Sequence, residues 1–258
     1  MTPFSLQRPT SVAAATAAFT GDAAWLAGGH TLIPAMKSRL RSVETLVDLS
    51  AIPGLDTIHR NGDRLVIGAM ATHAAVAASP VVQAAIPGLA ALAALIGDPQ
   101  VRNRGTIGGS IANNDPAADY PAALLALDAI VETTHGTHAA DAFFQGMFTT
   151  ALDEGELVTC VSFRVPSVSS YAKHRHPASR YALAGVYVAR FDDGVRVAVT
   201  GATTAVTRWP AAQAAITAGS TLPATLDSDD LATDIHASAE FRAHLAGVML
   251  RQAVAALG

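Results

Sequence analysis

Cysteine and charge are both scarce in this sequence, and each shortage excludes a class of protein. A single cysteine, Cys160, occurs among 258 residues. One thiol excludes a disulfide framework and any zinc or iron–sulfur site built from cysteines of this chain. Charged residues make up 15% of the chain and the formal net charge is −4, which argues against a nucleic-acid binder, since such proteins usually carry a basic patch.

Long apolar runs are also missing. The most apolar stretch, residues 88–97, is about half as long as the roughly 20 residues that a membrane-spanning helix needs. The first residues lack the basic start and leucine-rich run of a secretory signal. We therefore expect no membrane span and a cytoplasmic location.

What the chain has in abundance is apolar residues, which account for 50% of its length. That fraction is ample for a buried core and excludes a disordered chain. The length allows one large domain or two small ones. Because charge is sparse, part of the surface is expected to be covered by something other than water.

Patterns of strands and helices alternate along the first 155 residues. The apolar spacing, the Asn61-Gly62 turn signal and the capping residues predict this arrangement. The expected strands are 4–8, 25–27, 45–49 and 129–133, with a hairpin at 58–69; the expected helices are 10–19, 72–78, 88–96 and 121–127; and residues 98–120 are expected to form a long loop.

Composition changes near residue 155. A strand is expected at 157–165, followed by a hairpin of residues 181–190 and 195–204 around Asp192-Asp193-Gly194. The chain from residue 228 onward is expected to be helical. This order predicts an α+β protein with a boundary near residue 155.

Two glycine loops are the first candidates for binding chemistry. One covers residues 27–32 and follows a short strand, and the other covers residues 105–110. Paired glycines allow backbone N–H groups to approach a bound group, and successive N–H groups form a concave nest that suits a pyrophosphate. Neither loop matches the dinucleotide fingerprint or the phosphate loop of ATP-binding proteins. Taken alone, each loop could also be an ordinary tight turn.

Asp119 is the next candidate. Its carboxylate could accept hydrogen bonds from a ribose or an adenine. Equally, an aspartate before Tyr120-Pro121 fits a helix cap with proline in the first turn.

The remaining reactive side chains show no catalytic pattern. His174 and His176 lie among basic residues without a cluster of carboxylates, and His135 and His138 fall in a turn around Gly136. We therefore expect no metal site. No nucleophile elbow is present, and Cys160 lies in an alternating strand as a packed small side chain.

Several segments together resemble one family. They are residues 27–37, 106–111, 115–127 and 155–166, and the resemblance extends over nearly the whole chain in the same order. The family is that of the FAD-binding medium subunits of molybdenum hydroxylases, which include carbon monoxide dehydrogenase, aldehyde and nicotine dehydrogenases and the flavin domain of xanthine dehydrogenase.

The resemblance implies an α+β fold of the PCMH type. Residues 1–155 would form the FAD-binding part as two subdomains divided near residue 55. Residues 156–258 would form a smaller C-terminal domain of the carbon monoxide dehydrogenase flavoprotein type, with FAD extended in the cleft between these parts.

The resemblance also implies a set of cofactor contacts and no catalytic residue or metal ligand in this chain. Asp119 would bind the adenosine side of FAD, Lys173 and Tyr181 would border the flavin ring, and Tyr181 would cover one ring face. The pyrophosphate would be held by Ala27, Gly28, Gly29, His30, Thr31 and Leu32 of the first loop and by Thr106, Ile107, Gly108, Gly109 and Ser110 of the second. Two positions depart from the family pattern, since His30 replaces a common glutamine and Ser110 a frequent asparagine.

The function implied is that of an electron-transfer subunit. A large partner subunit would hold molybdopterin and a small one [2Fe–2S] clusters, assembled as a dimer of heterotrimers. FAD in this chain would pass electrons to NAD, a quinone or oxygen. Such chemistry belongs to the cofactor, so no general base is required here. The alternatives are a stand-alone flavin reductase of the same fold and a non-catalytic scaffold subunit whose glycine loops are only turns.

Overall fold

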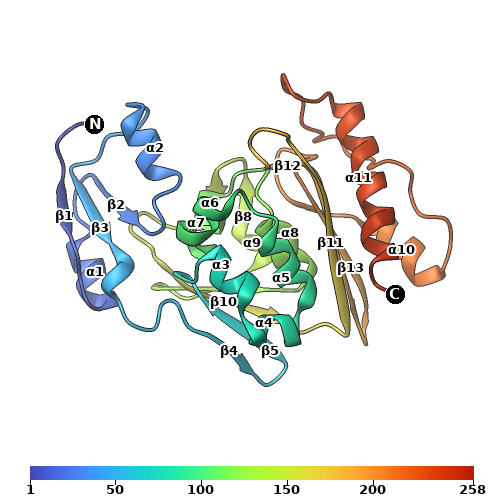
Figure 1. Cartoon of the computed structure of the whole chain (residues 1–258), viewed down its shortest axis with the longest axis horizontal. Helices are drawn as coiled ribbons and strands as arrows, with labels where there is room; N and C mark the ends of the chain where they lie inside the picture. The colour runs from blue at the N-terminus through green and yellow to red at the C-terminus, as the bar shows by residue number, and fades with distance from the viewer.

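The computed structural model describes all residues, 1–258, and arranges them in three consecutive lobes (Figure 1). The N-terminal lobe is a parallel three-stranded sheet in the order β1-β3-β2. Its strands are β1 (Ser5–Gln7), β2 (Ala23–Leu26) and β3 (Thr45–Asp48), and they are joined by α1 (Val12–Ala18) and α2 (Leu32–Lys37), with a 3₁₀ turn at Leu49–Ala51 after β3.

The central lobe contains an antiparallel five-stranded sheet in the order β4-β5-β10-β6-β7. Its strands are β4 (Ile58–Asn61), β5 (Arg64–Gly68), β6 (Ile130–Thr133), β7 (Thr137–Ala139) and β10 (Val158–Arg164). The helices of this lobe are α3 (His73–Ala78), α4 (Pro80–Ala85), α5 (Pro87–Ala94), α6 (Pro99–Arg104), α7 (Ile107–Asn113), α8 (Tyr120–Ala126) and α9 (Ala140–Phe143), and a small hairpin is formed by β8 (Phe144–Gly146) and β9 (Thr149–Thr150).

The C-terminal lobe is an antiparallel sheet in the order β11-β12-β13-β14, covered by two helices. The elements are β11 (Val168–Arg175), β12 (Ala182–Phe191), β13 (Gly194–Thr200), β14 (Thr207–Arg208), α10 (Pro210–Ala218) and α11 (Ala239–Ala255). The boundary predicted near residue 155 precedes β10, which completes the central sheet between β5 and β6; the C-terminal sheet begins only at Val168.

The long strand β12 explains how the C-terminal and central lobes are joined. Side chains alternate between the two faces of a strand, and both faces of β12 are buried. Tyr187 and Phe191 belong to the core shared with the central lobe, whereas Val186 and Val188 belong to a second core beneath α11. The N-terminal lobe has only small separate cores.

Two expectations about secondary structure were wrong. Residues 98–120 are not a loop, because Asp98 and Thr106 cap α6 and α7 by accepting hydrogen bonds from the N–H groups of Val101 and Gly109. The terminal helix starts at Ala239 rather than near residue 228, and the preceding segment is irregular. The predicted hairpins at 58–69 and 181–204 are confirmed. None of the helices combines the length and the apolar character needed to cross a membrane.

Candidate functional site

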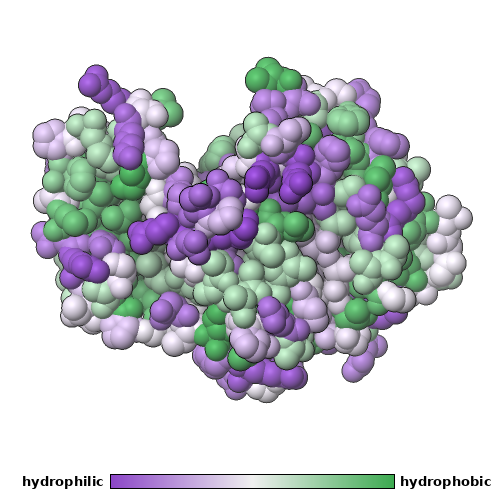
Figure 2. All heavy atoms as spheres, in the orientation of Figure 1, coloured by the Kyte–Doolittle hydropathy of each residue, from purple (hydrophilic) through white to green (hydrophobic).

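A cleft of about 1060 Å³ lies where the three lobes meet. It is at the upper end of the volumes usual for small-molecule sites, so it suits an extended ligand. Figure 2 shows the molecule hollowed between the N-terminal lobe and the C-terminal lobe. The wall is formed by the first glycine loop, by α7 with its preceding residues, and by the segment that leads into β12.

The first glycine loop leaves β2 and enters α2. No backbone carbonyl of the chain accepts a hydrogen bond from the N–H groups of residues 28–32. Gly29 has a φ of +77°, a conformation that favours glycine, and a Cβ at Gly28 would lie 2.1 Å from the carbonyl oxygen of Arg104. Successive free N–H groups at the start of a helix form a binding place for an anionic group.

The second glycine loop differs from the prediction. Its residues form the first turn of α7, and the N–H groups of residues 107–110 already have acceptors, namely Ala71 O, Ala69 O, Thr106 Oγ1 and Thr106 O. This loop is therefore not a nest of free donors. The reason is that α7 docks its first turn against the segment after β5, a contact that the local sequence does not reveal.

The two glycines of this turn have different surroundings. A Cβ at Gly108 would lie 2.6 Å from Ala69 Cβ, so this glycine permits a close contact between backbones. Gly109 is exposed, and its Cβ position lies 3.8 Å from Ala27 Cβ in the first loop. Gly109 is thus a cleft-lining position at which the two loops come within van der Waals distance of each other.

Asp119 is buried at the foot of one end of the cleft. Its Oδ1 accepts a hydrogen bond from the Tyr171 hydroxyl (2.6 Å), and its Oδ2 accepts one from Lys173 Nζ (3.0 Å). The Lys173 ammonium also forms an ion pair with Oδ1 over 2.9 Å. The helix-cap interpretation is wrong, because the Asp119 side chain makes no capping hydrogen bond. Burial raises the pKa of this carboxyl above its ordinary value, and Lys173 and Tyr171 oppose that rise.

Tyr181 follows Arg180, whose carbonyl group contacts this buried pair. Tyr181 is 44% exposed as a residue and lines the cleft. Lys173 Nζ donates a second hydrogen bond to Arg180 O (3.0 Å), which ties the Tyr181 segment to Asp119. Burial, Asp115 and Asp119 together raise the pKa of the Tyr181 hydroxyl.

The cleft therefore collects most of the residues expected from the sequence. Two do not line it: Ile107 is fully buried in the core, and Lys173 is buried beside Asp119. The residues that do are Ala27, Gly28, Gly29, His30, Thr31, Leu32, Thr106, Gly108, Gly109, Ser110, Asp119 and Tyr181.

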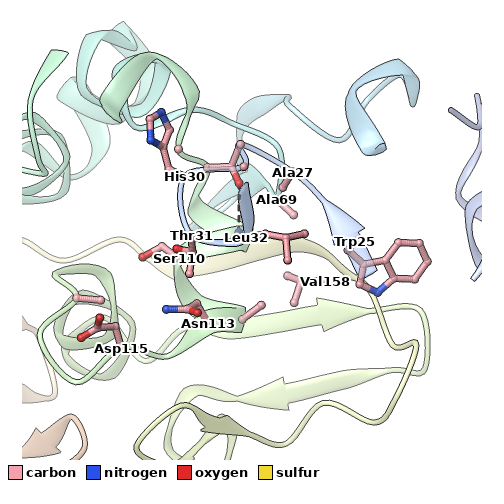
Figure 3. Close-up of a pocket in the computed structure, with 18 of the residues that line it drawn as sticks. Trp25, Ala27, His30, Thr31, Leu32, Ala69, Ser110, Asn113, Asp115 and Val158 are labelled. Carbon is pink, nitrogen blue, oxygen red and sulfur yellow. Dashed lines mark hydrogen bonds between the residues drawn. The ribbon is translucent and has the colours of Figure 1, made fainter. Parts of the chain in front are cut away.

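The cleft also contains residues that the sequence analysis missed. At one end Trp25 stacks on Phe19 with ring centroids 4.3 Å apart, and Figure 3 shows Ser110, Asn113 and Asp115 on the side away from Trp25. Phe148 is 58% exposed at the tip of the β8–β9 hairpin, with a φ of +53° that is unusual for a bulky residue. No motif marks these positions; only the fold brings them to the cleft.

Two buried nitrogen atoms in the cleft wall have no hydrogen-bond partner, Trp25 Nε1 and His73 Nδ1. Orphaned buried polar atoms are rare in folded proteins and are expected where a ligand supplies the partner. Burial, with contributions from His30 and Arg102, lowers the pKa of His73 to about 4, so its imidazole is neutral near pH 7.

Comparisons with known proteins agree on one family. Residues 2–167 match the family described as the FAD binding domain in molybdopterin dehydrogenase. The carbon monoxide dehydrogenase medium chain of Hydrogenophaga pseudoflava is 37% identical over 97% of this chain and 96% of its own length. The nicotine 6-hydroxylase medium subunit of Paenarthrobacter nicotinovorans is 34% identical over 92% of this chain and 90% of its own.

Solved structures give the same result. Carbon monoxide dehydrogenase from Hydrogenophaga pseudoflava matches with a TM-score of 0.87 and 35% identity, covering 100% of this chain and 98% of that one. Quinoline 2-oxidoreductase from Pseudomonas putida 86 matches with a TM-score of 0.86 and 26% identity, covering 99% and 97% of the two chains.

Proposed function

Because this chain belongs to the family of FAD-binding domains of molybdopterin dehydrogenases, we propose that it takes electrons from the iron–sulfur clusters of a partner subunit and delivers them to an external acceptor. The chain is a medium, FAD-binding oxidoreductase subunit of the molybdenum hydroxylase type, with the α+β PCMH-type fold. Molybdopterin and the iron–sulfur clusters belong to its partner subunits.

The observation that carries this proposal is the row of unpaired N–H groups at residues 28–32, opposite Gly109. A diphosphate is the anionic part of FAD, and free backbone donors at a helix start are suited to it. The cleft is large enough for FAD, and its wall contains two nitrogen atoms without a partner, Trp25 Nε1 and His73 Nδ1, which fits a ligand that makes both polar and ring contacts. The residues present therefore fit FAD.

We assign the cofactor contacts as follows. The N–H groups of residues 28–32 hold the diphosphate, with the hydroxyls of Thr31 and Ser110 beside it. The flavin ring lies at the Tyr181 end, and the adenine lies toward Trp25.

Asp119 takes a different role in this proposal from the one implied by the resemblance. It lies at the same end of the cleft as Tyr181, and both of its oxygens are engaged by Lys173 and Tyr171. We therefore assign Asp119 and Lys173 to holding the Tyr181 segment in place, rather than to binding the adenosine.

The protein contributes position and access, and FAD supplies the exchange of electrons in single and paired steps. The two glycine loops fix the cofactor between the lobes, and the Tyr181 segment sets what reaches the ring. No acid or base in this chain is required for such a role. The lone Cys160 cannot hold a cluster, so electrons must arrive from another subunit.

A comparison of the assembled complex before and after removal of FAD tests the proposal. In both forms substrate should still reduce the iron–sulfur clusters, as seen in their visible absorbance. Reduction of the external acceptor should be lost without FAD and return when FAD is added. Acceptor reduction that survives complete removal of FAD would contradict the proposed path.

A further inference from the structure

Beside the cleft, one cluster of side chains has the composition of a metal site, and one of its members, Glu156, also lines the cleft. It joins two turns that are remote in sequence. His135 lies in the turn between β6 and β7, and Asp153 and Glu156 lie in the turn before β10. Because β10 pairs with β6, with Val158 opposite Thr133, the two turns lie side by side at one end of the central sheet.

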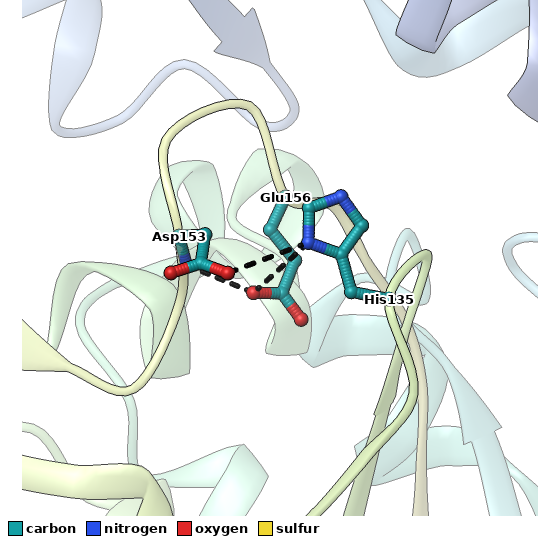
Figure 4. A group of neighbouring side chains, drawn as sticks. All are labelled: His135, Asp153 and Glu156. Atoms are coloured by element: carbon teal, nitrogen blue, oxygen red, sulfur yellow. Dashed lines mark hydrogen bonds and ion pairs between the residues drawn. The ribbon is translucent and has the colours of Figure 1, made fainter.

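Three potential ligand atoms converge there, as Figure 4 shows. His135 Nδ1 lies 3.6 Å from Asp153 Oδ2 and 3.7 Å from Glu156 Oε2. All three atoms lie within 4.8 Å of one another. In a triangle with sides of 3.6 Å, 3.7 Å and at most 4.8 Å, the point equidistant from the three atoms lies no more than about 2.4 Å from each. This distance is close to the roughly 2.0–2.2 Å of zinc bonds to nitrogen and oxygen. Shifts of a few tenths of an ångström would complete the coordination.

We propose that His135, Asp153 and Glu156 bind a divalent transition-metal cation, with Zn²⁺ as the best match. An imidazole with two carboxylates is a donor set that Zn²⁺ accepts, and the imidazole disfavours Ca²⁺ and Mg²⁺, which prefer oxygen ligands alone. Asp153 is 81% exposed and His135 is 49% exposed, so an ion can enter from solvent and keep water as its remaining ligand.

The surroundings of Glu156 support this assignment. Its side chain is only 1% exposed, and its Oε1 accepts hydrogen bonds from Thr133 Oγ1 and from His138, whose Nε2 lies 3.2 Å away. The Asp153 N–H donates to Oε2 over 2.8 Å. Partners of this kind orient a ligating carboxylate, and the arrangement leaves Oε2 turned toward His135.

The site lies next to the aromatic end of the cleft. Gly155, between the two acidic ligands, packs on the ring of Phe19: a Cβ added at this glycine would lie 3.1 Å from Phe19 Cδ1. Phe19 in turn stacks on Trp25. A bound cation would link the 153–156 turn to the β6–β7 turn, so the ion would stabilise this end of the cleft.

The competing explanation is a protonated His135 that bridges the two carboxylates without metal. Titration of the untagged, metal-stripped full chain with Co²⁺, which gains visible absorbance in a site of this type, separates the two. We expect one equivalent of Co²⁺ to bind, Zn²⁺ to displace it, and neither Ca²⁺ nor Mg²⁺ to compete. Zn²⁺ at a hundredfold excess over its Kd should raise the Tm by roughly 5 °C.

Variants locate the binding. His135→Ala should weaken Co²⁺ and Zn²⁺ binding by at least about 100-fold, and His138→Gln by about 10-fold, since it removes only an outer hydrogen bond. His59→Ala, at an exposed histidine of β4, is the matched control and should bind as the parent does. Absence of Co²⁺ binding, or equal binding by His135→Ala, would overturn the proposal and leave an ion pair only. None of these readouts depends on FAD.

Discussion

Gly109 offers the sharpest test of the proposed cofactor site, because valine at this position should block the cleft and leave the fold intact. The new Cβ would lie 3.0 Å from Thr106 Oγ1, which accepts the capping hydrogen bond from the Gly109 N–H, so this side chain has to shift. Loss of that cap costs about 1 kcal/mol, and replacing a helical glycine recovers a few tenths. Gly109 is exposed and lines the cleft, and the new Cβ would lie 3.8 Å from Ala27 Cβ, so the larger side chain would occupy cleft space next to the first loop.

We therefore expect Gly109→Val to lower FAD affinity by at least about 100-fold, which corresponds to about 2.7 kcal/mol, with a fall in Tm of no more than a few degrees. Flavin absorbance per protein after gel filtration and a titration of the FAD-free chain measure the first effect, and thermal unfolding without FAD measures the second.

Gly108→Ala is the matched control for Gly109→Val. Its Cβ would meet Ala69 Cβ at 2.6 Å and Ala69 O at 2.8 Å, an overpacking that costs about 1–3 kcal/mol of stability. Its FAD content per folded chain should stay near that of the parent. If Gly109→Val keeps one FAD per chain with unchanged affinity, Gly109 does not face the cofactor and the assignment of the two loops fails.

Three further predictions concern the Tyr181 end of the cleft and His73. Tyr181→Leu should retain FAD but change the rate of acceptor reduction several-fold in stopped-flow measurements; if both stay the same, the ring serves only in packing. Lys173→Met should cost about 3–5 kcal/mol in urea unfolding, since it leaves Asp119 buried without a partner charge, and Asp119→Asn in the same chain should recover part of the loss; a Lys173→Met chain as stable as the parent would refute this account. The folded-state pKa of His73 is about 4, below its ordinary value of 6.5, so below pH 6.5 the unfolded chain binds a proton that the folded chain does not. The free energy of unfolding is therefore highest above about pH 6.5 and falls by about 3 kcal/mol in total as the pH drops toward about 4. Urea unfolding at pH 7 and pH 4.5 gives the change in the free energy of unfolding between the two pH values. This change should be smaller for His73→Gln than for the parent, and an equal change would contradict the lowered pKa of His73.

Local patterns predicted much of the secondary structure. The hairpins around Asn61-Gly62 and Asp192-Asp193-Gly194 followed from turn chemistry and alternation, which act within a few residues. The segment 98–120 was wrongly predicted as a loop because its glycines and asparagines are typical of loops. Its two short helices are stabilised by the Asp98 and Thr106 caps and by burial of Ile107 against residues far along the chain.

Only part of the candidate site could be predicted from the sequence. The first glycine loop is a local feature, because a strand that runs into Gly28-Gly29 and then a helix exposes its own N–H groups. The second loop resembles the first in sequence, yet its N–H groups are used up by contacts with Ala69 and Ala71. Whether a donor is free depends on which distant carbonyl reaches it.

By itself, then, the sequence determined the alternation of helices and strands, the two glycine loops, the lack of any cluster-forming cysteines and the family to which the chain belongs. These properties reside in composition and in short-range pattern. Only the tertiary structure decided that Asp119 pairs with Lys173 rather than capping a helix, that Trp25 and Phe148 line the cleft, and that His135 meets Asp153 and Glu156. Each of these contacts joins segments that are far apart in the chain and are brought together by sheet pairing or lobe packing. Their energies depend on distances in the folded protein, so no short sequence pattern predicts them.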